Sequence, residues 1–475
     1  MRPEERLLED PTVAAVRAGL RGTGAAAWIV GGTVRDALLG RPLRDVDVAV
    51  AGDPEPAARA VAGALGGPVF RLSEAFGAWR ALDRRRRFLC DVSALQGGAI
   101  EADLGHRDFT VNAMAVPLDD GTLIDPHGGA ADLEAGVLRL VSPGAYDADP
   151  LRPLRLARLS AELDLRPDAD TEAATRAAAP RVPQASPERV FAELRRLIVA
   201  PGAMLGIELA DRLGLLAAVL PEVARLHGVE QSHYHHLDVY GHTIEVLARE
   251  IELEGRLGEL FPRLEPRLRA VLDEPLADEL TRGEALRLGA LLHDIGKPAT
   301  RGVRPDGRVT FIGHDSVGEE MVRSVCARLR TSERLTRYVE GLTRHHLVLG
   351  FLVHARPLDR REVYRYLKTT SPVEVEVTLL SCADRLATRG RRAEPAIEAH
   401  LDLARELMAE ALEWREHGPP RPPLRGDELA RAVGIERGPE LGSLLAALEE
   451  AAFAGEVENR EQAVELARRL RAEER

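Results

Sequence analysis

Residues 29–50, IVGGTVRDALLGRPLRDVDVAV, decide the fold of the N-terminal part of this chain. The apolar run that ends in Gly31 and Gly32 predicts a strand and a tight turn, the next segment predicts the start of a helix, and RDVDVAV alternates as a second strand does. Asp45 and Asp47 lie two residues apart on that second strand, so both side chains point to the same face of a sheet. Two carboxylates that share a face need a cation.

The rest of the chain divides into a mixed head and a helical remainder. Strand signals continue to about residue 145, and beyond Asp149 the residues Ala, Leu, Arg and Glu at helical spacing dominate to the C-terminus. We therefore predict an α+β protein with soft boundaries at Pro- and Gly-containing breaks. The predicted domains are a head (1–145), a helical neck (146–227), a third domain (228–395) and a helical tail (396–475).

Length, composition and charge narrow the class of protein. The 475 residues exceed what one hydrophobic core can hold, and 45% hydrophobic with 29% charged residues is typical of globular domains. Without a long apolar run or a secretory profile, we expect a soluble, cytoplasmic protein that spans no membrane. Three widely spaced cysteines exclude a CxxC metal site, so any metal must use His and carboxylate ligands. The net charge of −12 restricts nucleic-acid contact to a local basic surface.

The shared face of Asp45 and Asp47 predicts a site for nucleotidyl transfer. A pair of Mg²⁺ ions held by such carboxylates can activate an attacking hydroxyl and neutralise a triphosphate during in-line displacement. A third carboxylate from a neighbouring strand would complete the site. Asp91 in FLCDVSAL (88–95) is the natural candidate.

Residues that are suited to binding a phosphate group precede these carboxylates in the sequence. Gly31 and Gly32 permit close approach of the backbone to a phosphate at a helix N-terminus. Arg35 follows one helical turn later, and its guanidinium can donate to two phosphate oxygens at once. Together with the carboxylates, these residues have the composition of a nucleotide site.

A row of polar residues at three-residue spacing would form a slowly drifting stripe on one helix. Its members are Asp149, Arg152, Arg155 and Arg158. Such a stripe can face one ligand. Alternatively, Asp149 can cap the helix, with Pro150 at the first helical position, while the arginines face solvent. The residues alone leave both interpretations open.

Four motifs in order resemble the bacterial class II tRNA nucleotidyltransferases (CCA-adding enzymes) and poly(A) polymerases. They are residues 29–50, HRDFTVNAMA with IDPHGGAADL (106–115 and 124–133), DADPLRPLRLARL (147–159) and ERVFAELRRLI (188–198). The match covers about the first 225 residues. It implies a polymerase-beta-like head, a helical neck, and addition of nucleotides to an RNA 3′ end.

The resemblance assigns roles to matching positions of the head. Asp45 and Asp47 match the metal ligands, here for Mg²⁺. Gly32 and Arg35 match triphosphate contacts, with Gly31 beside them. Arg107 in the second motif matches a nucleotide contact.

The resemblance also assigns roles to the stripe of the neck. Asp149 and Arg152 match groups that hydrogen-bond to the Watson–Crick edge of the incoming base, so that protein replaces a nucleic-acid template. Arg155 and Arg158 match phosphate contacts.

The chain departs from the family pattern at several positions. Asp91 matches less tightly than the other carboxylates. Ala148 stands where relatives usually carry Glu, and we expect Pro153 to remove a hydrogen bond from the first helical turn, which would alter base selection. His106 replaces the first Arg of an RRD motif. QGGAI (96–100) replaces a longer loop that helps the pocket move from C to A, and a shortened loop accompanies enzymes that add only the two cytidines.

Histidines and carboxylates recur on predicted helices of the third domain. His242, the adjacent His293 and Asp294, and Asp384 lie on three separate amphipathic segments. Converging helices could hold a transition metal or Mg²⁺ with an open position that activates water, which suits phosphoester hydrolysis. Each histidine could equally be an ordinary core or surface residue.

These segments resemble the HD-domain phosphohydrolases over about residues 240–390. The resemblance implies that the quartet above binds a metal. His314 and His345 match positions that hold a second metal in binuclear members. Lys297 in HDIGKP is one of only two lysines in the chain and suggests an ammonium near a substrate phosphate.

The leading hypothesis is an Mg²⁺-dependent transferase that adds C and A, as CCA or part of it, to the tRNA 3′ end from CTP and ATP. A folded acceptor arm can be recognised through shape and phosphate, which suits a chain with 4% aromatic residues. The close rivals are a poly(A) polymerase and an enzyme that adds only CC. A rival of another class is an HD phosphohydrolase with a nucleotide-sensing head, and a further one is a noncatalytic RNA-binding scaffold. The sequence leaves the oligomeric state open.

Overall fold

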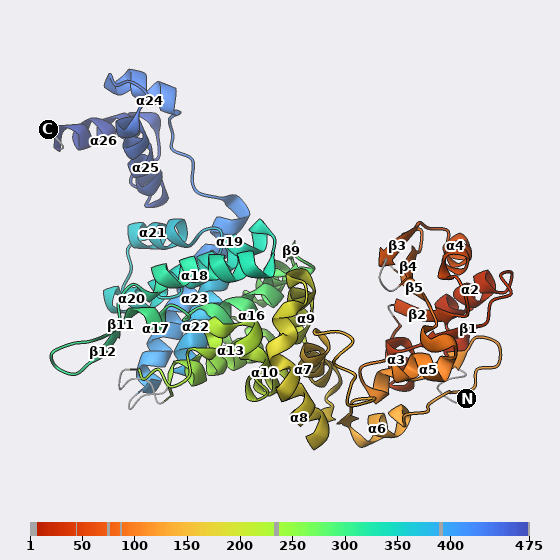
Figure 1. Ribbon diagram of the computed structural model, residues 1–475. Coiled ribbons are helices and arrows are strands. Elements are labelled where there is room, and N and C mark those ends of the chain that lie inside the picture. Colours follow the sequence, from red (N-terminus) through yellow and green to blue (C-terminus); the bar gives the residue numbers. More distant parts are fainter. Residues whose placement is uncertain are drawn as a thin grey trace. The chain divides into compact units, whose positions relative to one another are not determined.

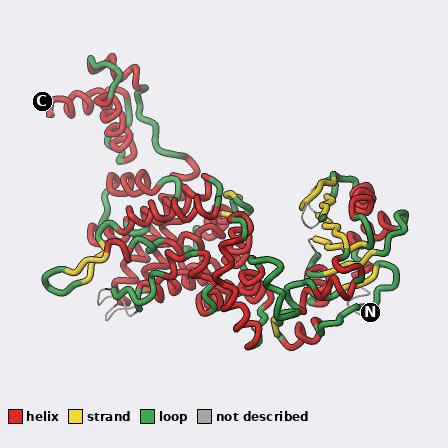
Figure 2. Tube along the Cα trace, viewed as in Figure 1, coloured by secondary structure: helices red, strands yellow, loops and turns green. Residues whose placement is uncertain are grey.

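The computed structural model of the chain is described over residues 7–43, 45–73, 77–85, 88–231, 237–388 and 393–473. It forms two compact units, Met1–Val219 and Leu220–Arg475 (Figure 1). The first unit contains a mixed sheet and helices, and the second is almost entirely helical (Figure 2). The predicted α+β class is confirmed.

A six-stranded sheet forms the centre of the head, in the order β3–β4–β5–β2–β1–β6. β2 and β5 are parallel, and the other neighbouring pairs are antiparallel. Both strands predicted within residues 29–50 are present. The strands are β1 (Ala27–Val30), β2 (Asp45–Val50), β3 (Val69–Ser73), β4 (Ala78–Leu82), β5 (Leu89–Ala94) and β6 (Ala115–Pro117).

Helices pack on both faces of this sheet. On one face, α2 and α4 form the main core of the head with Val46, Val48 and Val92. On the other face, α5 forms a smaller cluster with Val30 and Ala49. The helices of the head are α2 (Pro11–Leu20), α3 (Gly32–Leu38), α4 (Pro54–Leu65), α5 (Ile100–Gly105) and α6 (Gly129–Ala135).

The neck continues the first unit as a group of packed helices. α7 is central, because it packs against both α9 and α10. A short parallel pair, β7 (Val137–Leu138) and β8 (Arg166–Pro167), joins the segments before and after α7. The helices are α7 (Arg152–Leu163), α8 (Ala169–Ala178), α9 (Pro187–Val199), α10 (Ala203–Arg212) and α11 (Leu215–Val219).

The second unit is built on α13, α16, α19 and α22, which pack against one another. The sequence did not predict its two small strand pairs, β9 (Pro275–Ala277) with β10 (Leu280–Thr281) and β11 (Arg301–Val303) with β12 (Val309–Phe311). The helices are α12 (Pro221–Ala224), α13 (Val239–Gly255), α14 (Leu257–Leu260), α15 (Glu265–Leu272), α16 (Arg282–Leu292), α17 (Lys297–Thr300), α18 (His314–Leu329), α19 (Glu333–His345), α20 (Val348–Leu352), α21 (Arg360–Thr370), α22 (Glu374–Ala387) and α23 (Ala393–His417).

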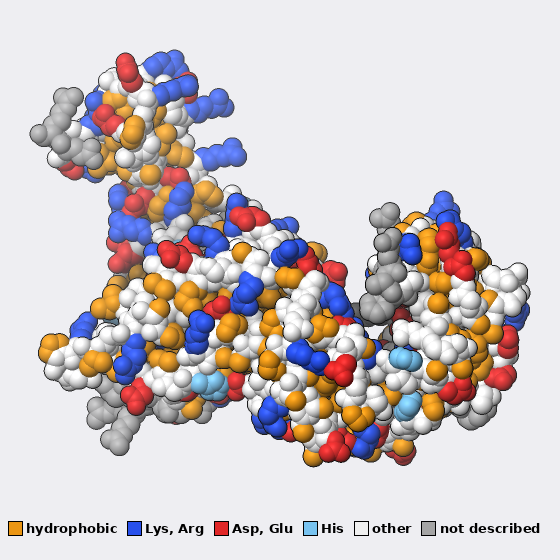
Figure 3. Space-filling model, viewed as in Figure 1, with side chains coloured by type: hydrophobic (Ala, Val, Ile, Leu, Met, Phe, Trp, Pro, Cys, Tyr) orange, Lys and Arg blue, Asp and Glu red, His pale blue; other side chains and the backbone are white. Residues whose placement is uncertain are grey.

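Three further helices, α24 (Gly426–Val433), α25 (Pro439–Phe453) and α26 (Arg460–Glu473), form the tail and have a small core of their own. Phe453 of α25 contacts the rings of Tyr364 and Trp414, which lie on α21 and α23. Acidic and basic side chains are interspersed over the face of the molecule drawn in Figure 3. Among the described residues, no helix is long and apolar enough to cross a membrane.

Candidate active site and metal centre

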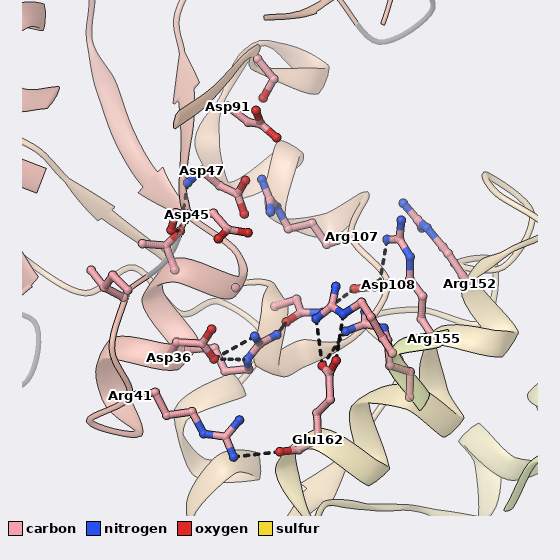
Figure 4. Close-up of a pocket in the computed structure, with 18 of the residues that line it drawn as sticks. Asp36, Arg41, Asp45, Asp47, Asp91, Arg107, Asp108, Arg152, Arg155 and Glu162 are labelled. Atoms are coloured by element: carbon pink, nitrogen blue, oxygen red, sulfur yellow. Dashed lines mark hydrogen bonds and ion pairs between the residues drawn. The ribbon is translucent and has the colours of Figure 1, made fainter. Parts of the chain in front are cut away.

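Asp45 and Asp47 line a cleft of about 980 Å³ in the first unit. Alternation along β2 buries the intervening valines and turns both carboxylates to the opposite face of the sheet. Asp91 on β5 lies beside Asp47, because the parallel register pairs these two residues. Figure 4 shows the three carboxylates and Arg107 around the same space. The structure therefore gathers the three acidic residues that the sequence singles out.

Arg80 on β4 holds Asp91 in a bidentate ion pair. Its Nε and Nη2 atoms each donate to one oxygen of Asp91 at 2.8 Å. No sequence pattern pointed to Arg80, because only the register of β4 against β5 places it on the same face as Asp91. Among the described residues, neither Asp45 nor Asp47 has such an ion pair, so these two carboxylates are the better candidates for metal ligands.

Burial raises the pKa of both Asp45 and Asp47. The pKa of Asp47 rises to about 6, because burial and the like charges of Asp91 and Asp45 outweigh the opposing charge of Arg107. For Asp45, burial outweighs the opposing charge of Arg196. Carboxylates that resist ionisation when gathered together are stabilised by a cation, and an all-oxygen donor set suits a hard divalent ion. The residues present therefore fit a metal site.

Gly31 lies in close contact with Arg107 beside Asp47. Gly31 has a φ of +69°, and a Cβ at this position would lie 2.5 Å from Nη1 of Arg107 and 3.6 Å from an oxygen of Asp47. Nη2 of Arg107 is held by Asp103 at 3.1 Å. A side chain at residue 31 would therefore displace the guanidinium, which explains in physical terms why glycine stands here.

Arg35 connects two of the sequence motifs. It follows Gly32 by one turn of α3, lines the cleft, and donates to Asn112 at 2.6 Å and to Asp36 at 2.9 Å. Asn112 in turn donates to Asp108 at 2.9 Å. The segments around Arg35 and Arg107 are thus joined by hydrogen bonds, although these two residues lie 72 positions apart in the chain.

The arginines of the predicted stripe lie together on the wall of the cleft. Arg152 donates to the backbone carbonyls of Ala145 at 2.6 Å and His106 at 2.7 Å. The other two arginines form ion pairs: Arg155 with Asp108 (3.3 Å) and Glu193 (3.4 Å), and Arg158 with Glu162 (2.6 Å) and Glu193. Figure 4 shows Arg152 and Arg155 near Asp108.

Two expectations for the start of this helix are wrong. α7 begins at Arg152 with Leu151 as its N-cap, so Asp149 does not cap it. Asp149 instead accepts a hydrogen bond from the Leu151 N–H at 3.1 Å and pairs with Arg189 at 2.5 Å, and it is not among the described residues that line the cleft. Pro153 lies in the first turn, where a helix makes no internal N–H bond, so it removes no helix hydrogen bond.

A second cluster of polar residues is buried in the second unit. His242 lies on α13, His293 and Asp294 follow α16, and Asp384 lies on α22. The Nε2 atom of His293 lies 3.1 Å from an oxygen of Asp294, and that of His242 lies 3.0 Å from Asp384 and 3.7 Å from Asp294. The structure thus brings the predicted quartet together.

The second predicted metal position needs a correction, because His346 and not His345 lies in this cluster. The Nε2 atom of His346 lies 3.3 Å from that of His314 and 3.7 Å from an oxygen of Asp294. Asp294, His314 and His346 have ligand atoms close enough to hold one ion, and no such group among the described residues contains His345. His345 ends α19, and the next residue turns inward.

The histidines of this cluster are oriented by backbone carbonyls. Nδ1 of His293 contacts Ala290 O at 2.9 Å, Nδ1 of His314 contacts Phe311 O at 2.7 Å, and Nδ1 of His346 contacts Thr343 O at 2.7 Å. Each carbonyl requires a proton on Nδ1, which leaves Nε2 with a lone pair directed into the cluster.

The buried polar atoms and the charges in this cluster also fit a metal. Nε2 of His293 and both oxygens of Asp294 are buried without a well-formed hydrogen bond. Burial alone would raise the pKa of Asp294, but the charges of His293 and Lys297 hold it well below its usual range. Burial lowers the pKa of His346 to about 4, which keeps the ring neutral and able to bind a cation. Imidazole and carboxylate ligands together suit a transition metal.

Lys297 contacts this cluster through Asp294. Its Nζ lies 2.6 Å from an oxygen of Asp294, donates to Gln231 at 2.8 Å, and lies 5.5 Å from the centre of the Phe311 ring. Its ammonium therefore lies next to the Asp294 carboxylate, where a phosphate bound to the cluster would approach it.

Comparison with known proteins identifies the family. The Poly A polymerase head domain matches residues 27–139, the probable RNA and SrmB-binding site of polymerase A matches 164–226, and the HD domain matches 239–389. The chain is 37% identical over 437 residues to the A-adding tRNA nucleotidyltransferase of Deinococcus radiodurans, with 91% of this chain and 92% of the relative covered. The chain belongs to the tRNA nucleotidyltransferase family.

The names of other members of the tRNA nucleotidyltransferase family specify different added nucleotides. The CC-adding tRNA nucleotidyltransferase of Thermus thermophilus is also 37% identical, over 445 residues and 92% of each chain. Among solved structures, a CCA-adding enzyme of Thermotoga maritima complexed with tRNA has a TM-score of 0.62 at 20% identity and covers 98% of this chain and 97% of its own. The predicted resemblance is confirmed, and the solved structure supports the fold.

The raised pKa of Asp47 predicts a pH-dependent requirement for Mg²⁺. Below about pH 6 this carboxyl is protonated and a proton competes with the metal, so the Mg²⁺ concentration for half-maximal nucleotide addition should rise on the order of tenfold per pH unit. Because the charge of Arg107 lowers this pKa, Arg107→Met should move the onset of the effect to higher pH. Titrations of Mg²⁺ between pH 5 and 8 would measure both shifts, and a constant requirement across that range would contradict them.

The corrected ligand assignment predicts a difference between adjacent histidines. His346→Ala should lower the bound metal content of the purified protein at least twofold, because it removes one buried Nε2 donor from the group with Asp294 and His314. His345→Ala is the matched control and should retain the metal. Metal content is measured by inductively coupled plasma mass spectrometry after dialysis. Equal loss in both variants would contradict the assignment.

Proposed function

We propose that this chain adds cytidines to the 3′ end of tRNA from CTP and stops after the second one. The observation that carries the transferase function is the pair Asp45 and Asp47, which share one face of β2 and line the cleft. Membership of the tRNA nucleotidyltransferase family supports the tRNA substrate. The solved relatives include complexes of CCA-adding enzymes with CTP and with ATP.

In the proposed reaction, the 3′ oxygen of the RNA forms a bond to the α-phosphorus of the nucleotide. The bond from that phosphorus to the bridging oxygen breaks, pyrophosphate leaves with the electron pair, and the hydroxyl proton passes to solvent. Asp45 and Asp47 would hold Mg²⁺, which supplies positive charge to the attacking oxygen and the triphosphate. Arg35, Arg107 and the two glycines at the start of α3, Gly31 and Gly32, bind and orient the phosphates.

The limit of two cytidines is supported by the connection between β5 and α5. Only five residues, 95–99, separate Ala94 from Ile100, and they include the short 3₁₀ turn Gln96–Gly98. The Gln96 N–H donates to Asp103 at 3.0 Å, and a Cβ at Gly97 would lie 2.8 Å from Ala102. The connection is therefore short and packed against α5. A rearrangement of the pocket from C to A would need more chain than is present here.

The test uses tRNA transcripts that end before CCA, after C, or after CC, with CTP and ATP given separately and together. We expect two cytidines on the first transcript, one on the second, and no addition of A to the third. Asp45→Ala and Asp47→Ala should each lower the rate on the order of a thousandfold, because the metal loses a ligand. Complete CCA, addition of A alone, or long A tracts would each contradict the proposed limit, and no addition to any RNA would contradict the transferase function.

The buried cluster of the second unit favours a second activity, metal-dependent hydrolysis of phosphoesters. It combines imidazole and carboxylate donors, unpaired buried atoms and the ammonium of Lys297. A bound transition metal would lower the pKa of a water molecule for attack on phosphorus. Hydrolysis of p-nitrophenyl phosphate and of RNA ending in a 2′,3′-cyclic phosphate should be lost in His293→Ala and retained in Asp45→Ala. Absence of hydrolysis from the metal-loaded wild-type protein would contradict this activity.

A further inference from the structure

One row of residues crosses the head sheet through the catalytic carboxylates. The strand registers pair Asp47 with Asp91, Asp91 with Arg80, and Arg80 with Phe70. Because paired residues on neighbouring strands point to the same face, Phe70 of β3 lies on the face that carries Asp47 and Asp91. The row therefore ends in an aromatic side chain at the outer edge of the sheet.

Phe70 is exposed on this face, whereas its neighbour packs inside. Val69 contacts the main core of the head on the opposite face. Phe70 is 43% exposed, and Leu72, which lies at an irregularity in the register of β3 against β4, is 44% exposed. Packing within the head accounts for Val69 but leaves an aromatic and an aliphatic surface uncovered next to the catalytic row. An uncovered aromatic ring beside a nucleotide site is a suitable platform for a base.

The chemistry of nucleotidyl transfer decides which base can occupy that platform. Gly31, Arg35 and Arg107, which suit the triphosphate, lie on the β1 side of Asp47. In-line displacement requires the attacking hydroxyl and the leaving pyrophosphate on opposite sides of the α-phosphorus. With the triphosphate on the β1 side, an approach of the attacking RNA end from the side of β5, β4 and β3 satisfies this requirement. Phe70 lies on that side.

Arg80 makes the surface between Asp47 and Phe70 suitable for an RNA backbone. Its side chain lines the cleft, and the pair with Asp91 uses Nε and Nη2. Among the described residues, Nη1 of Arg80 has no such contact and can donate to a phosphate oxygen. At about 4.8 Å between neighbouring strands, three strand intervals separate Phe70 from Asp47 by about 14 Å. A terminal nucleotide with its 3′ oxygen at Asp47 and its base turned outward reaches toward the Phe70 ring.

We propose that Phe70, Leu72 and Arg80 form the binding site for the 3′-terminal nucleotide of the acceptor RNA. The terminal base stacks on Phe70 beside Leu72, and the phosphate of that nucleotide receives a hydrogen bond from Arg80. This inference rests on the proposed transferase function, and it assigns the acceptor end, not the incoming nucleotide, to this surface. Stacking on an aromatic ring is tolerant of base identity, which suits a terminus that changes after each addition.

The test separates acceptor binding from nucleotide binding. In Phe70→Ala, the KM for a tRNA minihelix should rise about five- to tenfold while the KM for CTP stays within twofold. Phe70→Trp should restore a KM for RNA close to that of the wild-type protein, because the stacking surface is kept. Phe351→Ala, which truncates a 69% exposed phenylalanine in the second unit, is the matched control and should change neither constant. Melting temperatures of the variants confirm that the fold is kept.

A second measurement reports stacking directly. A minihelix with 2-aminopurine at its 3′ end should lose fluorescence on binding the wild-type protein and Phe351→Ala, and lose less on binding Phe70→Ala. An unchanged KM for RNA in Phe70→Ala, or equal changes in the two KM values, would overturn the inference while the transferase function stands. A protein partner on this surface would give the first of these results. If the wild-type protein adds no nucleotide, the proposed function itself fails.

Discussion

The parallel pairing of β2 with β5 is the constraint on which the catalytic half of this molecule depends. It places Asp47 beside Asp91, and β4 then adds Arg80 to the same face. Burial of Asp47, reinforced by the like charges of Asp91 and Asp45, raises its pKa to about 6. Arg80 compensates one carboxylate. Among the described residues, the other two carboxylates have no such ion pair, and a divalent metal would supply the positive charge that neutralises them.

A chain of polar contacts ties the distant sequence motifs into one cleft. Arg35 donates to Asn112, Asn112 to Asp108, and Arg155 of α7 pairs with Asp108. Burial would raise the pKa of Asp108, but the charges of Arg155 and Arg152 and the hydrogen bonds from Asn112 and the Phe109 N–H together outweigh it and lower the pKa, so this buried carboxylate stays ionised. These hydrogen bonds and this ion pair therefore hold the first helix of the neck against the head, so that the arginines of α7 stay on the wall of the cleft.

The two proposed metal sites differ in the chemistry that their donors allow. The head offers carboxylate oxygens on one strand face, which suits a hard ion beside a triphosphate. The second unit offers imidazoles whose Nδ1 atoms contact backbone carbonyls, such as those of Ala290 and Thr343, so that the Nε2 atom of each ring is directed into the cluster. This arrangement suits a softer ion and activation of water. One chain thus contains donor sets for phosphoryl transfer and for phosphoester hydrolysis.

The sequence by itself determined the α+β class and the shared face of Asp45 and Asp47, because the strand period fixes which neighbours share a face. The grouping of His242 with His293 and Asp294, which lie on separate helices, was implied only by the resemblance to the HD-domain phosphohydrolases. Only the tertiary structure decided the roles of Arg80 and Phe70, since strand register joins residues that are far apart in the chain. It also replaced His345 with His346, because the backbone stays helical through His346 and consecutive side chains point about 100° apart, so that only His346 faces the cluster. The local sequence pattern fixes the direction in which side chains point along one strand or helix. The packing between elements then selects which of these side chains come into contact.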